Sequence, residues 1–206
     1  MKTEKRGFSR GSFPRLLVLV PHRDVRLPLR SWSGELFAAG IPGAWSFPRV
    51  APLAALTRAL SADELKSMAR ALRERLRESG GVFRAGPPAL APLPFAPDGK
   101  PVFAFGPVLE PAGQDALFAF GPAPENSARD AFFGGRVSPV RRITPAVLGA
   151  ALLHGPPPAG FPEPPRVSFR ASALAVARFR PLYAGNRSGD GLSLEWEIGK
   201  LYWLPK

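Results

Sequence analysis

The stretch RLLVLVP, residues 15–21, decides how the rest of the chain is expected to fold. Five consecutive aliphatic residues closed by a proline are typical of a strand that is buried at the centre of a sheet. The run is too short to cross a membrane, which takes roughly 20 apolar residues, and charged residues return at Arg23. The sequence therefore predicts a soluble protein with no membrane partner.

The segment before this strand is basic. Residues 1–13 (MKTEKRGFSRGSF) are polar, positively charged and contain glycine, which predicts a flexible tail.

Residues 14–206 are long enough for a single domain made of two lobes that share a core. The whole chain carries a net charge of +12, and such an excess attracts polyanions such as nucleic acids. Because the arginines are scattered, the alternative is that they only solvate the surface.

The residue types limit the chemistry that the chain can perform. It has no cysteine, which excludes disulfide bonds, thiolate metal ligands and a cysteine nucleophile and fits a reducing compartment. Only two histidines are present, His22 and His154, too few for a structural zinc site. We therefore expect a cytoplasmic protein with no metal ion and no cofactor.

A first helix is predicted between the strand and Gly40. Leucine and tryptophan residues recur there at helical spacing, and glycine commonly ends a helix. Because proline disfavours an earlier start, we predict that this helix begins at Pro28 or Leu29 and ends at Ala39.

The stronger helix signal is SADELKSMARALRERLRES, residues 61–79. Ser61 and Glu64 have the spacing of a capping box, in which the hydroxyl and the carboxylate each bind the other residue's amide. The charged face of this helix gives no signal beyond that of a solvated surface. Its apolar face is expected to be buried and consists of Leu65, Met68, Ala69, Leu72 and Leu76.

The second half of the chain is dominated by extended segments. Residues 85–100 are rich in proline, which predicts an extended connection between elements. The repeat VFAFGP (102–107) and LFAFGP (117–122) then predicts two aromatic strands that pair with each other as a hairpin.

The end of the chain predicts a longer hairpin. RVSFRASA alternates polar and apolar residues, and the alternation slips near Leu174, which indicates a bulge. LSLEWEI, residues 192–198, alternates cleanly. Opposite charges across two strands stabilise a register. The register predicted on this ground pairs Arg178 with Glu197 and Arg180 with Glu195.

Two further stretches share an arginine ahead of an apolar run, SFPRVAPLAAL (46–56) and RITPAVLGAAL (142–152). Their order, together with the first strand closed by proline, the LSADELK helix and the terminal strands, resembles the LigT-like two-histidine phosphoesterase superfamily. That superfamily includes RNA cyclic phosphodiesterases and 2′-5′ RNA ligases. The resemblance implies an α+β fold of two antiparallel lobes related by a pseudo-twofold axis, with a few flanking helices. Each lobe would offer a His-x-Thr motif to a central cleft.

Arginine stands where each of these motifs would have its histidine. The first motif reads Arg49-Val50-Ala51, and the second is placed at Arg142-Ile143-Thr144 or, in another register, at residues 146–148. A guanidinium stays protonated in proteins, so it cannot transfer protons as an imidazole does. It can instead bind phosphate oxygens through two parallel hydrogen bonds. These features together predict a non-catalytic domain that binds RNA or a nucleotide phosphate through Arg49, Arg142, Thr144 and His22.

Three other interpretations remain open. The cleft is filled, and the two stretches are only walls of a core with Arg49 and Arg142 at its edges. Alternatively, the chain is an active phosphoesterase that uses His22 or His154 in an unusual arrangement. In the third, it is a protein-interaction domain with no nucleic-acid role.

Overall fold

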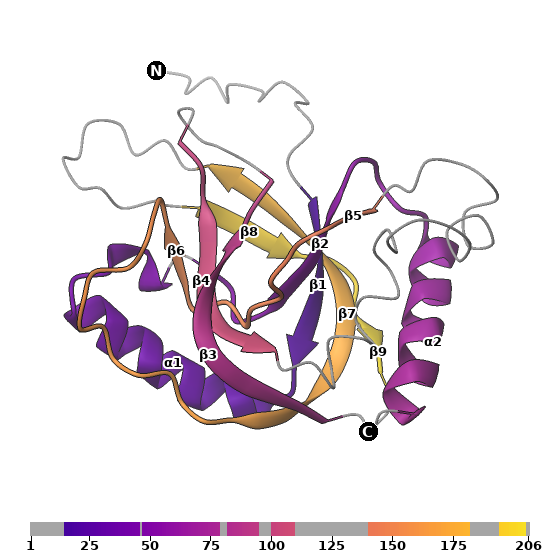
Figure 1. Ribbon diagram of the computed structural model, residues 1–206. Coiled ribbons are helices and arrows are strands. Elements are labelled where there is room, and N and C mark those ends of the chain that lie inside the picture. Colours follow the sequence, from indigo (N-terminus) through magenta and orange to yellow (C-terminus); the bar gives the residue numbers. More distant parts are fainter. Residues whose placement is uncertain are drawn as a thin grey trace, which may run out of the picture.

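The computed structural model describes residues 15–45, 47–78, 82–94, 100–109, 140–181 and 194–204, and the predicted tail lies outside them. Within these residues, nine antiparallel strands and two α-helices form an α+β fold, as predicted (Figure 1). The elements in chain order are β1 (Arg15–Pro21), α1 (Arg23–Ala38), the 3-10 helix η1 (Pro42–Trp45), β2 (Ala51–Leu56), α2 (Ala62–Glu78), β3 (Val82–Pro92), β4 (Phe103–Leu109), β5 (Val140–Arg142), β6 (Ala151–Leu153), β7 (Ser168–Pro181), β8 (Leu194–Ile198) and β9 (Tyr202–Trp203).

β1 lies inside the sheet, as its aliphatic run predicts. It pairs with β2 on one side and with β7 on the other. The strands follow the order β5-β2-β1-β7-β3-β4-β6, and β8 and β9 also pair with β7. Every side chain from Leu16 to Val20 is at most 4% exposed. Because both faces of the strand are covered, its sequence has no polar alternation.

α1 begins earlier than the predicted start at Pro28 or Leu29. It spans Arg23–Ala38 and contains Pro28. Val25, in the additional first turn, is buried on the same face as Leu29 and Trp32. The free energy gained by burying Val25 outweighs the loss of the backbone hydrogen bond that Pro28 cannot donate.

The C-terminal end of α1 matches the prediction closely. The amide of Gly40 donates to the Phe37 carbonyl at 3.0 Å, and the amide of Ile41 donates to the Leu36 carbonyl at 3.0 Å. This pattern requires a left-handed residue after the helix, and Gly40 has a φ of 86°. Glycine adopts that angle without steric strain, so the sequence signal and the cap agree.

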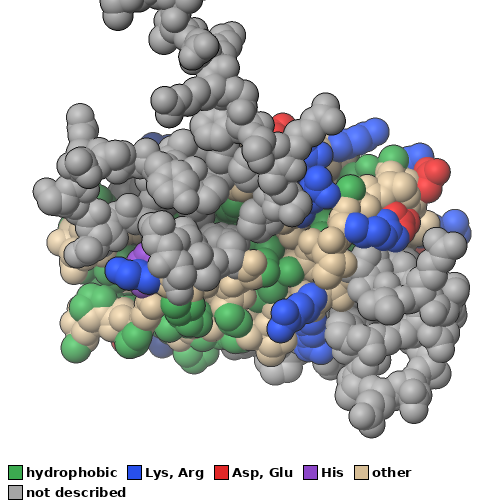
Figure 2. Space-filling model, turned by 90° about the horizontal axis from the view of Figure 1, so that it is seen from above, with side chains coloured by type: hydrophobic (Ala, Val, Ile, Leu, Met, Phe, Trp, Pro, Cys, Tyr) green, Lys and Arg blue, Asp and Glu red, His purple; other side chains and the backbone are tan. Residues whose placement is uncertain are grey.

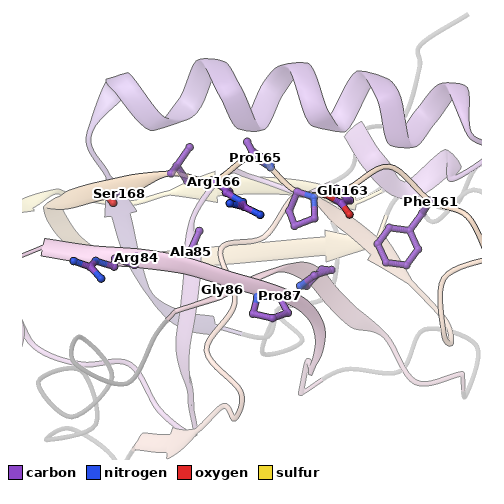
Figure 3. Close-up of a pocket in the computed structure, with 12 residues that line it drawn as sticks. Arg84, Ala85, Gly86, Pro87, Phe161, Glu163, Pro165, Arg166 and Ser168 are labelled. Atoms are coloured by element: carbon purple, nitrogen blue, oxygen red, sulfur yellow. The ribbon is translucent and has the colours of Figure 1, made fainter.

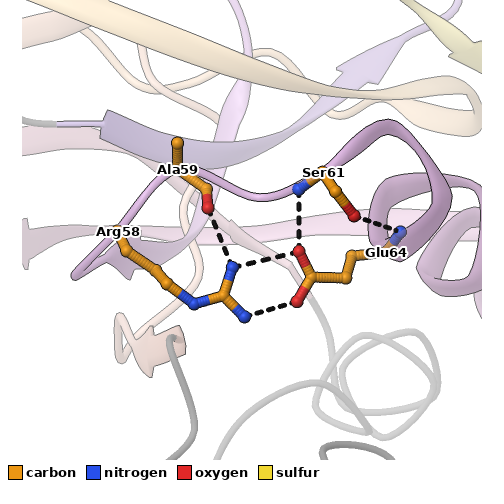
Figure 4. A network of polar contacts seen from close by, with 4 residues as sticks. All are labelled: Arg58, Ala59, Ser61 and Glu64. Atoms are coloured by element: carbon orange, nitrogen blue, oxygen red, sulfur yellow. Dashed lines mark hydrogen bonds and ion pairs between the residues drawn. The ribbon is translucent and has the colours of Figure 1, made fainter.

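α2 begins at the predicted capping box (Figure 4). The Ser61 amide donates to the Glu64 carboxylate at 2.7 Å, and the Glu64 amide donates to the Ser61 hydroxyl at 3.2 Å. Arg58 also binds Glu64, through both of its terminal guanidinium nitrogens. The predicted apolar face is buried throughout: Leu65, Met68, Ala69, Leu72 and Leu76 are each at most 8% exposed.

This network gives the helix start a pH dependence. The hydrogen bond from Arg58, and next that from the Ser61 amide, lower the pKa of Glu64 from 4.5 to about 2. Because the pKa is lower in the folded state, the carboxylate stabilises the fold fully above pH 4.5. This contribution is lost as the pH falls towards 2. Arg58 and Glu64 are partly exposed, so solvent reduces the effect.

Replacing Glu64 with glutamine is expected to lower the free energy of unfolding at pH 7 by about 1 kcal/mol, the usual cost of removing a cap. At pH 3 the deficit should be clearly smaller, because the wild-type carboxylate has by then lost part of its advantage. Urea unfolding at both pH values measures this difference. Glu74→Gln, at an exposed position later in α2, is the matched control. An equal deficit for Glu64→Gln at both pH values would contradict the role given to its charge.

β3 replaces the extended connection predicted over residues 85–100. Its conformation is extended, but it is a paired strand that joins β7 through residues 82–84 and β4 through residues 85–92. The pairing with β4 is irregular between Ala85 and Pro88. Prolines have no amide to donate to a neighbouring strand, and they are tolerated where a ladder is interrupted.

The hairpin predicted between residues 102–107 and 117–122 has no counterpart in the described residues. The second of these segments lies outside them. β4 pairs with β3 on one side and, at Phe103–Phe105, with β6 on the other. These three residues therefore have neither edge available for a further strand.

The terminal hairpin has the predicted register. Its residue pairs include Arg178 with Glu197 and Arg180 with Glu195, so this prediction is confirmed. The predicted bulge near Leu174 lies slightly earlier, where the pairing with β1 skips Ser172 between Ala171 and Ala173.

The sheet is strongly curved. Its two parts, one with β3, β4 and β6 and the other with β1, β2 and β8, enclose an apolar interior. Figure 1 shows β3, β4 and β6 in front of β1, β2 and β8. One face of β1 packs with the helices, because Leu17 and Leu19 cluster with apolar residues of α1 and α2. The other face joins a second cluster that both parts of the sheet contribute to. Its members include Leu16, Val18, Phe47, Ala91, Ala104, Leu152, Ala173, Ala175, Ala177 and Phe179.

Candidate nucleic-acid interface

The two arginine-containing stretches lie side by side. Arg142 pairs with Ala54, and the amides of Ile143 and Gly149 donate to the carbonyls of Leu53 and Val50 at 2.9 and 3.0 Å. The apolar residues that follow the two arginines, 50–55 and 146–152, are all buried. They are adjoining walls of the core, as the interpretation with a filled cleft predicts.

Arg49 and Arg142 lie at separate points of this shared wall. Arg49 is next to Val50, whereas Arg142 is opposite Ala54. Arg49 thus precedes β2, whereas Arg142 lies beside the middle of that strand. Both side chains are partly buried. Burial, and next the nearby charge of Arg30, lower the pKa of Arg49. The sharing of one phosphate by the two guanidiniums stays a prediction.

Thr144, the third predicted residue, is exposed just after β5. Its peptide bond to Pro145 is cis. The side chain of Ile143, directly before it, is buried in the interior cluster. Thr144 does not line any of the three cavities described below.

The two histidines lie apart. His22 is exposed at the start of α1, with Nδ1 2.9 Å from a carboxylate oxygen of Asp24, and it shares a cavity with Val82 at the first residue of β3. His154 is exposed after β6, with Nδ1 3.0 Å from the Pro101 carbonyl. β6 connects through β4 to the last residues of β3. The structure therefore does not bring His22 and His154 together as a catalytic pair.

A basic groove lies between α2 and β9 and has a volume of about 540 Å³. α2 contributes cationic side chains at successive spacings of four, three and four residues, which places them along one face of the helix. β9 contributes its two aromatic residues. The cationic and aromatic residues that line the groove are Lys66, Arg70, Arg73, Arg77, Tyr202 and Trp203.

Direct contacts hold the aromatic strand against the helix. Arg73 Nη2 donates to the main-chain carbonyl of Trp203 at 2.8 Å. Lys200 Nζ lies 5.9 Å from the centre of the Tyr202 ring, within the range of a cation–π interaction. The Trp203 side chain nevertheless remains 63% exposed. The groove thus combines fixed cations with an indole ring whose surface is available to a ligand.

The groove stays positively charged despite its ion pairs. Arg70 binds Glu74 at 3.2 Å, and Asp63 binds Lys66 at 2.9 Å and raises its pKa. Glu74 is the single carboxylate among the lining residues. Figure 2 shows basic side chains with a few acidic ones among them on the right-hand part of the molecule, the side on which Figure 1 places α2.

A second cavity, of about 620 Å³, lies between the start of β3 and the segment 161–168. Figure 3 shows Arg84 on β3 and Arg166, Glu163 and Phe161 on the facing segment. Four prolines also line it. With two arginines and a carboxylate it concentrates less positive charge than the basic groove, so it is the weaker site for a polyanion.

Comparison with protein-family models, with curated proteins and with solved structures finds no match to this chain. In the described part of the chain, no helix combines the length and apolar character needed to cross a bilayer. The same residues contain no group of three histidine, cysteine or acidic residues that would hold a metal ion.

The cationic face of α2 could be recognised from the sequence, whereas the contribution of β9 to the basic groove could not. The cationic face of α2 was evident, but it was interpreted as a solvated surface. Arg73 and Trp203 are 130 residues apart, and no local pattern predicts that they touch. The one available signal was the adjacent Tyr202 and Trp203 near the end of a basic chain.

Proposed function

We propose that this chain binds single-stranded RNA in the basic groove between α2 and β9, without cleaving it. Proteins that bind single strands combine a cationic groove for the backbone with aromatic side chains on which bases stack. The observation that carries the proposal is the exposed Trp203, held through its carbonyl by Arg73 of the basic helix face. Tyr202 and Trp203 line the groove together with the cationic side chains of α2, and this combination of aromatic and basic side chains is typical of sites for single strands.

The resemblance to LigT-like proteins supports RNA as the polymer, and the proposal includes a LigT-like, pseudo-twofold relationship between the two parts of the sheet. The order of β1, α1, β2 and α2, with the first arginine stretch leading into β2, supports that relationship. The absence of a histidine at Arg49 and Arg142 supports binding without turnover. A cytoplasmic location follows from the same resemblance and from the lack of cysteine.

Binding of a fluorescein-labelled 12-nucleotide oligouridine, measured by fluorescence anisotropy between 50 and 200 mM KCl, tests this proposal. We expect the combined substitution Arg70→Gln and Arg77→Gln to weaken binding. It should also reduce the slope of log affinity against log salt by about 1.4, which is about 0.7 for each lost phosphate contact. Trp203→Ala should weaken binding at least about fivefold, the lower limit for one stacked base.

Two comparisons make the result specific. Lys100→Gln with Arg141→Gln removes the same charge from exposed positions outside the groove and should leave the slope nearly unchanged. Arg49→Gln with Arg142→Gln tests the site first expected from the sequence. If either pair weakens binding as much as the groove pair, the groove is not the binding site. Circular dichroism establishes that each variant is folded.

A phosphoesterase is the second candidate, because Asp24 holds His22 Nδ1 at 2.9 Å beside a cavity. A carboxylate in this position orients an imidazole for proton transfer. Incubation with a 2′,3′-cyclic nucleotide would then give turnover that His22→Ala abolishes. No turnover by the wild-type protein is the outcome expected from the main proposal.

A further inference from the structure

A third cavity, of about 690 Å³, adjoins the basic groove at Trp203. It lies where the start of α1, the start of β3, β7 and β9 meet. This volume is within the usual range for sites that bind small molecules. Trp203 lines both the cavity and the groove, so an RNA strand bound along α2 would meet the cavity at this residue.

The walls of the cavity suit a flat, apolar ring with polar edges. Val25, Val82 and Leu204 line the cavity together with Trp203 and contribute to its apolar surface. Val82 is 44% exposed and Trp203 is 63% exposed, so both present apolar surface to solvent. A nucleobase stacks on an indole and buries its faces against aliphatic side chains.

The polar groups of the cavity suit the edge and the phosphate of a nucleotide. Asp24 accepts a hydrogen bond from His22 Nδ1–H in the neutral imidazole, and this tautomer leaves Nε2 as an acceptor. Nucleobases carry N–H donors on their edges. Arg170 is exposed at the same cavity and provides a positive charge for a phosphate, whereas Asp24 repels a phosphate from its own side.

We infer that one nucleobase of the bound single-stranded RNA inserts into this cavity, stacked on Trp203 and hydrogen-bonded to His22. This inference rests on the proposed function, because the groove along α2 brings the strand to the cavity. The cavity would add a site that encloses one base. The groove itself would contact only the phosphates and offer the exposed Trp203 ring for stacking. The chain is then expected to prefer RNA with at least one unpaired base over a fully paired duplex.

The test uses the 12-nucleotide oligouridine with one 4-thiouridine, crosslinked by ultraviolet light to the full chain and mapped by mass spectrometry. We expect adducts at Trp203 and in the segments that contain Val82 and residues 168–172. In parallel, Val82→Asp should weaken binding of the unmodified oligouridine at least about fivefold, because a charged side chain replaces an apolar wall that holds the base in the cavity against Trp203. Phe37→Asp is the control, since it adds the same charge to an exposed apolar residue at the other end of α1 and should change binding less than twofold.

The outcomes separate this inference from the proposed function. If Arg70→Gln with Arg77→Gln weakens binding but Val82→Asp behaves like Phe37→Asp, the groove binds RNA and the cavity does not. Adducts confined to α2 would likewise overturn the inference alone. If the wild-type chain shows no salt-dependent binding, the proposed function fails and the inference fails with it.

Discussion

Replacing Trp32 with alanine should lower the free energy of unfolding by about 4 kcal/mol, within the range for removing a buried tryptophan. The indole is 2% exposed, donates a hydrogen bond to the Pro162 carbonyl at 2.9 Å, and lies 5.8 Å from the Phe105 ring, centre to centre. The alanine variant leaves a large cavity in the core and an unpaired carbonyl. Urea unfolding followed by circular dichroism measures the loss.

Two substitutions separate the contributions to this loss. Trp32→Phe keeps most of the apolar surface but not the donor, and it should cost about 1 to 2 kcal/mol. Trp203→Ala removes the same residue type from an exposed position and should change stability by less than about 0.5 kcal/mol. Equal destabilisation by Trp32→Ala and Trp203→Ala would show that burial is wrongly assigned. If the Trp203→Ala variant is as stable as the wild type, its result in the oligouridine-binding experiment can be interpreted without a correction for unfolding.

Replacing Gly106 with alanine should destabilise the protein by about 3 kcal/mol, at the upper end for an overpacked core. A Cβ at this position would overlap the carbonyl oxygen of Leu148 and lie 2.7 Å from its carbonyl carbon. The neighbouring hydrogen bonds, from Leu148 to Pro107 and from Ala150 to Phe105, are both 2.8 Å long. These hydrogen bonds hold the backbone of β4 close to that of residues 148–150, so neither segment can shift to make room for the added Cβ.

Gly155→Ala is the matched control, because a Cβ there meets no atom within 4 Å. It should change the free energy of unfolding by less than about 0.5 kcal/mol. Thermal unfolding of both variants followed by circular dichroism compares them directly. If Gly106→Ala is as stable as Gly155→Ala, the close approach of β4 to residues 148–150 is incorrect.

The features predicted correctly from the sequence depend on neighbours in the chain or on one strand pair. The capping box at Ser61 and Glu64 needs only a spacing of three residues. The aliphatic run of β1 needs only burial on both faces. The register that places Arg178 opposite Glu197 follows from charge pairing within a single hairpin. Each of these signals is contained in a short stretch of sequence.

The features that were missed depend on contacts between distant segments. The early start of α1 follows from the burial of Val25 against the rest of the core, which outweighs the local effect of Pro28. The proline-rich segment became β3 because β4 and β7 are available as partners. The direct pairing of Arg142 with Ala54 joins residues far apart in the chain. Sequence spacing alone contains no information about these contacts.

The candidate site likewise combines residues that local sequence signals indicated with residues that only contacts between distant segments bring together. The resemblance placed attention on Arg49 and Arg142, whose stretches prove to be neighbouring parts of the core wall. The groove and the cavity at Trp203 are assembled from segments near the two ends of the chain and from α2. His22 is a candidate on the basis of the sequence. Trp203 becomes a candidate only because the fold places it in the lining of both the groove and the cavity.

In the interior cluster that β7 shares with β3 and β4, each of these strands contributes alanine: Ala173, Ala175 and Ala177 from β7, Ala91 from β3 and Ala104 from β4. Short side chains at these positions let the facing strands approach closely. The groove proposed to bind RNA lies outside this cluster, because none of the residues that line the groove belongs to it. The proposed function therefore implies that exposed side chains of the groove can be exchanged to alter RNA binding while the residues of this cluster stay unchanged.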